Sequence, residues 1–224
     1  MNNERGALII VSGTTCAGKG TVIKELLKRN ENMWLSISYV TRDKRENEKH
    51  GRDYYFISKE EFQDKIDNNE MLEHMEVHKG IFYGTPKMDI EEKLKNGVDV
   101  ILEIDVRGAL IIKEKVPEAI CIFVLAPSIE EVKRRIIARG SDSAKQIFNR
   151  FKTAYQEITE VSKYNYVVIN DILEKAVHKV EAILTAEKCS IERIEETFLN
   201  SQAEKLHELL RDDKEFENED IEIE

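Results

Sequence analysis

The sequence predicts an α/β protein built on a doubly wound, mostly parallel sheet. Apolar runs of strand length alternate along the chain with segments whose apolar residues recur at helical spacing. Unbroken apolar runs are typical of parallel strands that are buried on both faces. A glycine-rich turn with a lysine, residues 13–21, directly follows the first of these runs. In such a sheet the ligand site is expected at the carboxyl ends of the strands.

Five runs are expected to be strands, and four segments between them are expected to be helices. The strands are predicted at 7–12, 34–40, 98–105, 119–126 and 164–170, and the helices at 20–30, 88–97, 129–140 and 172–184. Gly140 follows an arginine and is the expected stop of the third helix. The segment from about 42 to 85 is polar, rich in Tyr and Phe, and interrupts the alternation, so we expect an inserted subdomain there.

Composition limits the class of protein. The 224 residues, 41% hydrophobic and 35% charged, suit one helix-rich globular domain, either alone or with an appendage. No apolar run approaches the roughly 20 residues that span a membrane, and we expect no signal peptide. Three scattered cysteines argue against a disulfide framework or a zinc site and suit a reducing cytoplasm. The net charge of −10 argues against wholesale nucleic-acid binding.

The last part of the chain has a different character. Residues 191–211 show apolar residues at helical spacing without Gly or Pro, so a helix is expected. Residues 212–224 then hold eight acidic residues against one lysine, which predicts a solvated, disordered tail. A tail that binds a partner is the alternative. We therefore expect a main domain over 1–189, followed by a helical extension and acidic tail over 190–224.

The turn GTTCAGKGT matches the phosphate-loop pattern G-x-x-x-x-G-K through Gly13, Gly18 and Lys19. Backbone N–H groups and a helix N-terminus form a positive hollow for phosphate there, and the lysine adds a full charge. A glycine-rich turn with an exposed lysine is the alternative. Two positions are unusual: Gly20 lacks the hydroxyl that often reaches Mg²⁺, and Cys16 adopts a positive φ less freely than glycine. The expected ATP contacts in the loop are Gly13, Thr14, Thr15, Cys16, Ala17, Gly18, Lys19, Gly20 and Thr21.

Six further blocks resemble the guanylate kinases, the ATP:GMP phosphotransferases among the nucleoside monophosphate kinases. They are SISYVTRDKR (36–45), GRDYYFIS (51–58), EVHKGIFYGTP (76–86), VILEIDVRG (100–108), APSIEEVKRRIIARG (126–140) and YVVIND (166–171). Six blocks in the family's order and spacing are far more specific than the loop alone. The resemblance implies a P-loop fold with a GMP-binding subdomain over about 36–92 and a helical lid over about 127–158.

The resemblance implies a clamp for the GMP phosphate. Arg42 and Arg45 offer guanidinium forks, and Tyr54 and Tyr83 offer hydroxyl donors, with a similar contact from Ser38. From the spacing alone, two solvated arginines in a polar loop would explain the pattern equally well.

The resemblance also implies a guanine-reading pocket. Guanine presents N1–H and N2–H donors beside the O6 acceptor, so carboxylates suit the donors and a hydroxyl suits O6. Glu73 and Asp105 are similar to the family's guanine-reading acids, and Thr85 and Ser38 are the hydroxyl candidates. Such a pocket is expected to reject AMP, because adenine would leave buried polar groups unpaired.

The lid block supplies further arginines. By resemblance, Arg135, Arg139 and Arg150 close over the triphosphate, and Asn170 lies on the adenine side. The alternative is a solvated basic helix face. Electrostatic stabilisation of the transferring phosphoryl group is then expected from Lys19, Arg45, Arg139 and Arg150. The expected cofactor is Mg²⁺, bound with ATP, which Thr21 and Glu103 would reach through water.

The implied activity is in-line transfer of the γ-phosphoryl of Mg-ATP to GMP, and to dGMP, without a nucleophilic side chain. The expected partners are these nucleotides, with no nucleic acid and no membrane, in a cytoplasmic monomer or homodimer. A non-catalytic guanylate-kinase-like binding module is one alternative, which Lys19, Arg139 and Arg150 disfavour. A kinase for another nucleoside monophosphate is the second, which the two acids disfavour. Departures from the family's pattern at Thr14, Thr15, Cys16, His74, Arg107 and Ile172 bear on the ATP contacts and on efficiency.

Overall fold

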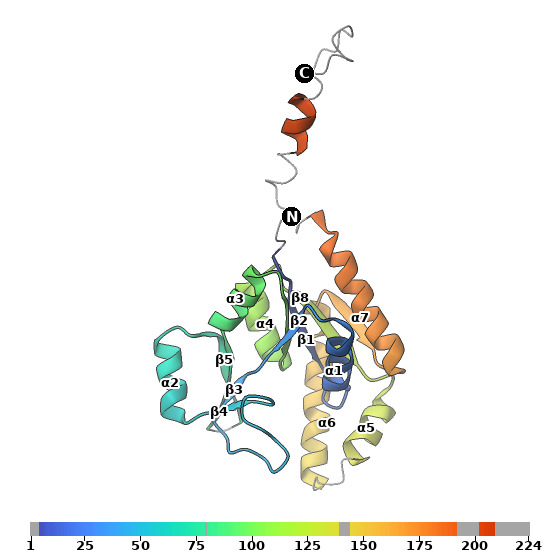
Figure 1. The fold of residues 1–224 in the computed structure, drawn as a ribbon. Helices are drawn as coiled ribbons and strands as arrows, with labels where there is room; N and C mark the ends of the chain where they lie inside the picture. Colours follow the sequence, from blue (N-terminus) through green and yellow to red (C-terminus); the bar gives the residue numbers. More distant parts are fainter. Residues whose placement is uncertain (1–4, 79, 139–143, 192–201, 209–224) are drawn as a thin grey trace. The chain divides into compact units, whose positions relative to one another are not determined.

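The computed structural model describes residues 5–78, 80–138, 144–191 and 202–208. The chain divides into two compact units, Met1–Ile183 and Leu184–Glu224. The strands are β1 (Leu8–Gly13), β2 (Met33–Ser36), β3 (Tyr39–Val40), β4 (Tyr55–Phe56), β5 (Met71–His78), β6 (Ile81–Pro86), β7 (Asp99–Glu103), β8 (Ile120–Leu125) and β9 (Tyr166–Ile169). The helices are α1 (Lys19–Arg29), α2 (Lys59–Asp67), α3 (Met88–Lys95), α4 (Val106–Lys115), α5 (Ile129–Ala138), α6 (Ala144–Thr159) and α7 (Leu173–Lys188), with a 3₁₀ turn at Val161–Lys163 (Figure 1).

The central sheet confirms the predicted doubly wound architecture. Its five strands lie in the order β2-β7-β1-β8-β9, and every pair is parallel. β1 is wholly buried and lies between β7 and β8, with Leu8 opposite Val100 and Ile9 opposite Ile120. The connection after β1 leads to β2 at one edge of the sheet, whereas the connection after β7 leads to β8, on the other side of β1. The carboxyl end of β1 is therefore the switch point at which such sheets bind ligands.

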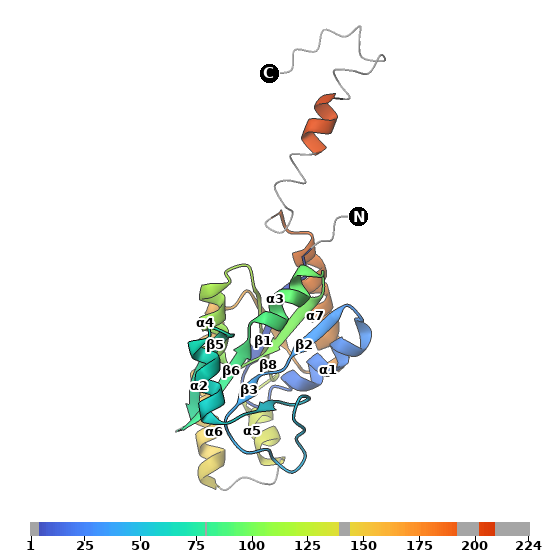
Figure 2. The same ribbon diagram turned by 60° about the vertical axis from the view of Figure 1, so that its left-hand side comes forward.

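Helices cover both faces of this sheet. On one face, Ile10 and Leu102 belong to a cluster of buried residues that also contains Ile90 of α3 and Ile112 of α4. Alternate residues of a strand point to opposite faces, so Ile9 and Ile101 point to the other face. α1 and the first part of α7 cover that other face (Figure 2). Burial on both faces explains why the strands read as unbroken apolar runs.

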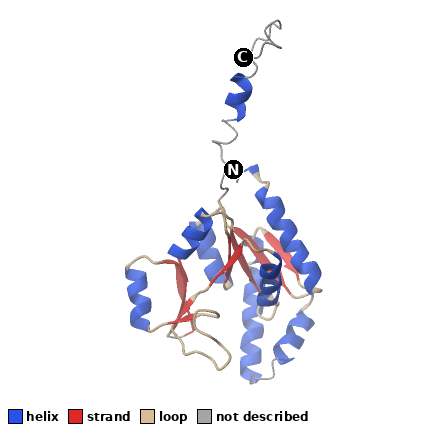
Figure 3. Cartoon of the chain, in the orientation of Figure 1, coloured by secondary structure: helices blue, strands red, loops and turns tan. Residues whose placement is uncertain are grey.

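The segment that interrupts the alternation forms a second sheet, in the order β4-β3-β6-β5, with α2 beside it (Figure 3). One expectation is wrong here: 34–40 is not a single strand. The chain leaves the central sheet after Ser36, and Tyr39 and Val40 pair with β4 and β6 instead. Both halves of this run are apolar, and apolarity does not say which sheet a strand joins.

The structure adds helices that the sequence reading left out. α2 begins with a capping box, in which the Ser58 hydroxyl accepts the N–H of Glu61 and the Glu61 carboxylate accepts the N–H of Ser58. Asp105 is the N-cap of α4, and its carboxylate accepts the N–H of Gly108. α6 lies within the helical lid expected over about 127–158, where only 129–140 was expected to be a helix. Residues 202–208 are helical, within the helix expected at 191–211, whereas Gly140 and the acidic tail lie outside the described residues. Within the described part of the chain, no helix is long and apolar enough to span a membrane.

Candidate functional site

The phosphate loop follows β1 at the switch point of the sheet. Gly13 has φ 141°, and a Cβ there would lie 2.0 Å from the carbonyl oxygen of Val124, so only glycine fits. Gly18 caps α1 with φ 88°. Cys16 also adopts a positive φ, 60°, which the sequence reading regarded as difficult for a residue with a side chain. The loop keeps its shape at a conformational cost of about 1 kcal/mol at Cys16.

Lys19 is folded back over this loop. Its Nζ donates hydrogen bonds to the carbonyl oxygens of Gly13 and Thr14, at 2.8 and 3.2 Å. Burial lowers the pKa of Lys19, and the nearby carboxylates of Glu157 and Glu103 partly offset that effect. The ammonium group therefore lies in a poorly solvated position directly beside the loop, where an anionic ligand would interact with it strongly.

Arg135 and Asn170 hold the loop from another side. The Arg135 guanidinium donates to the carbonyl oxygens of Ala17 and Asn170, each at 3.2 Å, and Glu131 accepts from its Nε. The buried Asn170 amide donates to the Ala17 carbonyl oxygen at 2.8 Å. Both expected ATP contacts thus lie against the loop, whereas Arg139 lies outside the described residues.

Three residues expected in the phosphate clamp, Arg42, Tyr54 and Tyr83, lie together at the second sheet. The Arg42 guanidinium lies 5.3 Å from the centre of the Tyr54 ring, and its Nε donates to the Tyr83 hydroxyl oxygen at 3.3 Å. Ser38 is half-buried just before β3. Glu48 binds Arg42 through two parallel hydrogen bonds of 2.6 and 2.7 Å. These bonds lower the pKa of Glu48 to about 2, so the carboxylate remains ionised beside the clamp.

The expected guanine-reading groups meet where β5 approaches α4. Glu73 is buried, and its Oε1 accepts the Thr85 hydroxyl at 2.6 Å. No group among the described residues donates to Glu73 Oε2, which is also buried. A Cβ on Gly108 would lie 3.3 Å from this oxygen and 3.5 Å from Asp105 Oδ1, so the two carboxylates are close. Burial raises the pKa of Glu73 to about 7.

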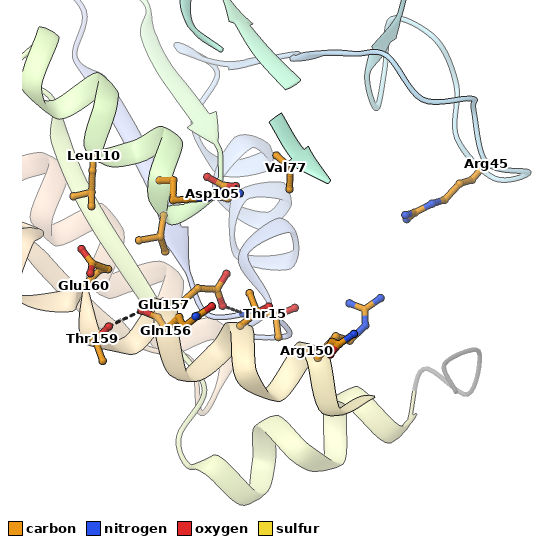
Figure 4. Close-up of a pocket in the computed structure, with 14 residues that line it drawn as sticks. Thr15, Arg45, Val77, Asp105, Leu110, Arg150, Gln156, Glu157, Thr159 and Glu160 are labelled. Carbon is orange, nitrogen blue, oxygen red and sulfur yellow. Dashed lines mark hydrogen bonds and ion pairs between the residues drawn. The ribbon is translucent and has the colours of Figure 1, made fainter. Parts of the chain in front are cut away.

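One large cavity extends from the phosphate loop to the loop of the second sheet that carries Arg45. It measures about 1260 Å³, and Thr15, Asp105, Arg45 and Arg150 lie on its wall. Figure 4 shows Arg45, on the loop of the second sheet, and Arg150, on α6, projecting toward the same space. The cavity is therefore bordered by the phosphate loop, by the clamp segment and by the second lid helix.

The residues beside the loop fit a magnesium ion. Glu103 ends β7, and a Cβ on Gly20 would lie 3.4 Å from both of its carboxylate oxygens. Desolvation raises the pKa of Glu103, while Lys19 opposes that shift. Thr21 is exposed near the start of α1. One carboxylate and a hydroxyl at the edge of a phosphate site match the sparse protein coordination that Mg²⁺ takes beside nucleotides.

Two carboxylates in the site were missed by the sequence reading. Glu48 lies in an irregular loop, where no periodicity relates it to Arg42. Glu157 lies on α6, and its Oε2 accepts the N–H of Thr15 in the phosphate loop at 2.8 Å. A signal for Glu157 was available, because it follows Arg150 by seven residues, or about two helical turns. That spacing only becomes informative once residues 144–159 are recognised as a helix.

A phosphate loop at the switch point of a parallel sheet, with a second basic segment across the cavity, defines a P-loop kinase of the type that phosphorylates small nucleotides. Comparison with known proteins makes the class specific. The family model described as "Guanylate kinase" matches residues 5–187. The chain is 53% identical over 209 residues to a guanylate kinase of Clostridium tetani, which covers 93% of this chain and 100% of that protein. It is 50% identical to a guanylate kinase of Clostridium acetobutylicum, over 94% of this chain and 100% of that one.

A solved structure agrees with this result. The crystal structure of guanylate kinase from Anaplasma phagocytophilum superposes with a TM-score of 0.71 at 35% identity, over 85% of this chain and 90% of that chain. The chain belongs to the guanylate kinase family.

Proposed function

We propose that this protein transfers the γ-phosphoryl group of ATP to GMP and dGMP, giving ADP and the nucleoside diphosphate. The observation that carries the proposal is one cavity that is bordered by the phosphate loop, Arg45, Arg150 and Asp105. The buried pair of Glu73 and Thr85 supports guanine as the base, because carboxylate oxygens accept from its N–H groups. dGMP carries the same guanine base and phosphate group as GMP, so the groups assigned to the acceptor would bind it as well.

The roles of the residues follow from the chemistry. Transfer through a loose transition state needs alignment and neutralisation of charge more than covalent help. Arg42, Arg45, Tyr54 and Tyr83, with Ser38, orient the acceptor phosphate, and Glu73, Thr85 and Asp105 hold the guanine. The loop from Gly13 to Thr21, with Arg135, Arg139 and Asn170, holds ATP. Lys19, Arg45, Arg139 and Arg150 stabilise charge on the transferring group.

Glu103 and Thr21 would hold a magnesium ion, which would screen the charge of the ATP phosphates. Closure of the acceptor-binding subdomain, about 36–92, and of the lid, about 127–158, excludes water from the reacting groups. Exclusion of water in this way favours transfer to GMP over hydrolysis of ATP.

A coupled assay of ADP release tests the proposal. GMP, dGMP, AMP and UMP are each supplied with ATP and Mg²⁺, beside a reaction without acceptor. We expect turnover with GMP and dGMP, and at most a trace with the others. Activity with AMP but none with GMP would refute the guanine assignment. No turnover with any acceptor would favour a non-catalytic binding module.

Glu48 gives a first prediction, for the phosphate clamp. Glu48→Ala removes both bonds that fix the Arg42 fork, so KM for GMP is expected to rise about 10-fold, as for the loss of charge-assisted hydrogen bonds. Because the clamp is remote from the phosphate loop, KM for ATP should change less than about twofold. Glu46→Gln, an exposed carboxylate in the same loop, is the control. A rise in KM for ATP equal to that for GMP would contradict the role of Glu48.

The pH dependence of GMP binding gives a second prediction. Burial raises the pKa of Glu73 to about 7, and only the ionised form offers both oxygens as acceptors without an O–H that would face the guanine N–H groups. KM for GMP is therefore expected to fall several-fold between about pH 6 and pH 8. In Glu73→Gln, the part of the fall in KM that comes from ionisation of Glu73 should be absent. Titration of the GMP phosphate affects KM equally in both proteins. A parallel pH profile in the two proteins would count against the assignment.

The raised pKa of Glu73 also makes the free energy of unfolding depend on pH. Glu73 titrates near 4.5 in the unfolded chain and near 7 in the folded protein, so the unfolded chain loses this proton first. The contribution of Glu73 to the free energy of unfolding therefore falls as the pH rises from about 4.5 to about 7. Glu73→Gln should be more stable than the parent above about pH 7, as measured by denaturant unfolding.

A further inference from the structure

Glu157 is a carboxylate of the site that phosphoryl transfer, as described, leaves without a role. It lies near the end of α6, and its Oε2 accepts the N–H of Thr15 at 2.8 Å (Figure 4). Burial raises the pKa of Glu157, while the bond from Thr15 and the charge of Lys19 oppose that shift. A helix of the lid is thus joined directly to the phosphate loop by one hydrogen bond.

The same helix carries Arg150. Seven residues separate Arg150 from Glu157, which places both on one face of α6 about 10 Å apart along the axis. Both side chains lie on the wall of the cavity. One end of this helical face is therefore fixed to the phosphate loop, while the other end presents its guanidinium group to the space opposite Arg45.

The hydrogen bond between Thr15 and Glu157 does not use the N–H groups at the start of α1. Thr15 lies three residues before Gly18, the N-cap of α1. The first N–H groups of α1, those of Lys19 and Gly20, have no intrahelical partner and suit a phosphate, whereas the N–H of Thr21 already donates to the carbonyl oxygen of Gly18. Of the charged groups near Lys19, Glu157 gives the largest favourable interaction. The carboxylate therefore also balances the ammonium charge beside which the triphosphate would bind.

We propose that Glu157 is a positioning residue for phosphoryl transfer, which holds α6 on the backbone of Thr15 and so sets the place of Arg150 relative to Lys19. The inference rests on the proposed function, in which Lys19 and Arg150 both act on the triphosphate. It requires the hydrogen bond from Thr15 rather than the negative charge alone. Substitutions that separate these two properties therefore test it.

Three variants of the full chain make that separation. Glu157→Gln keeps an acceptor oxygen without the charge, Glu157→Asp keeps the charge but is one methylene too short, and Glu157→Ala removes both. We expect kcat of the glutamine variant within about threefold of the parent, and kcat of the other two lower by about 10- to 100-fold. KM for GMP should stay within about twofold in all three. Lys152→Ala, an exposed position on the same helix, is the control and should match the parent.

Exchange of the Thr15 amide hydrogen, followed by NMR, gives a readout that does not depend on turnover. We expect slow exchange in the parent and in the glutamine variant, and fast exchange in the aspartate and alanine variants. If the alanine variant fails to fold, the glutamine and aspartate variants decide the question. A parent without GMP-dependent turnover would refute the proposed function, while the exchange rates would still report on the bond.

Other outcomes would overturn the inference. Tighter binding of ATP and undiminished kcat in the alanine variant would show that the carboxylate obstructs the loop. Activity in the aspartate variant but not in the glutamine variant would show that charge alone matters. Equal kcat in all the variants, with unchanged exchange at Thr15, would show that the bond has no effect on the reaction.

Discussion

Replacing Lys19 with methionine is expected to lower kcat by about 10²- to 10³-fold, the effect of removing one preorganised group that stabilises transition-state charge. The Lys19 ammonium is held by two loop carbonyl oxygens at 2.8 and 3.2 Å, and burial lowers its pKa. A charge in such a poorly solvated place interacts more strongly with phosphate than a charge in water does. Methionine has a similar length without the charge.

The fold should tolerate this change. Removing a desolvated charge also removes the cost of its burial, so we expect no loss in the free energy of unfolding. Steady-state kinetics at saturating GMP and ATP, with thermal unfolding of the same samples, measure both effects. Lys24→Met, an exposed lysine one turn further along α1, is the matched control and should keep kcat within about twofold. Turnover close to the parent in Lys19→Met would rule out the assigned role.

Local patterns of sequence predicted the scaffold well. The alternation of buried runs and helical segments corresponds to β1, β7, β8, β9 and the helices between them, because burial on both faces makes a parallel strand continuously apolar. The phosphate loop was recognised for a related reason: Gly13 and Gly18 occupy backbone conformations that the pattern of a phosphate loop requires. Cys16 shows the limit of that reasoning, since it adopts a positive φ without being glycine.

The interactions that join distant segments could not be predicted from local patterns. The run at 34–40 divides between two sheets, because strand partners are chosen by contacts that lie far along the chain. Glu48 and Glu157 were missed because each is bonded to another group of the site, an arginine fork and a backbone N–H, and belongs to no motif of its own. The sequence therefore indicates the groups that face a ligand more readily than the groups that hold them in place.

Exchanging Glu73 for glutamine is expected to lower kcat/KM for GMP by about 10²-fold, with little effect on KM for ATP. Glu73 Oε1 is bonded to the Thr85 hydroxyl, and no group among the described residues donates to the buried Oε2. A buried acceptor without a donor is unfavourable, so this oxygen is suited to receive an N–H group from a ligand. Glutamine either loses that acceptor or turns an N–H group toward the N–H groups of guanine.

Discrimination between bases should change along with the rate. The parent is expected to favour GMP over AMP by about 10⁴-fold or more, because adenine would leave the pocket's acceptors unpaired. Glu73→Gln should narrow this ratio mainly by losing GMP activity, and Glu76→Gln, on the exposed side of the same strand, should leave it unchanged. The ratio is measured from kcat/KM for both nucleotides at pH 8, where Glu73 is ionised in the parent. An unchanged ratio in Glu73→Gln would mean that guanine is read elsewhere in the cavity, with Asp105 as the next residue to substitute.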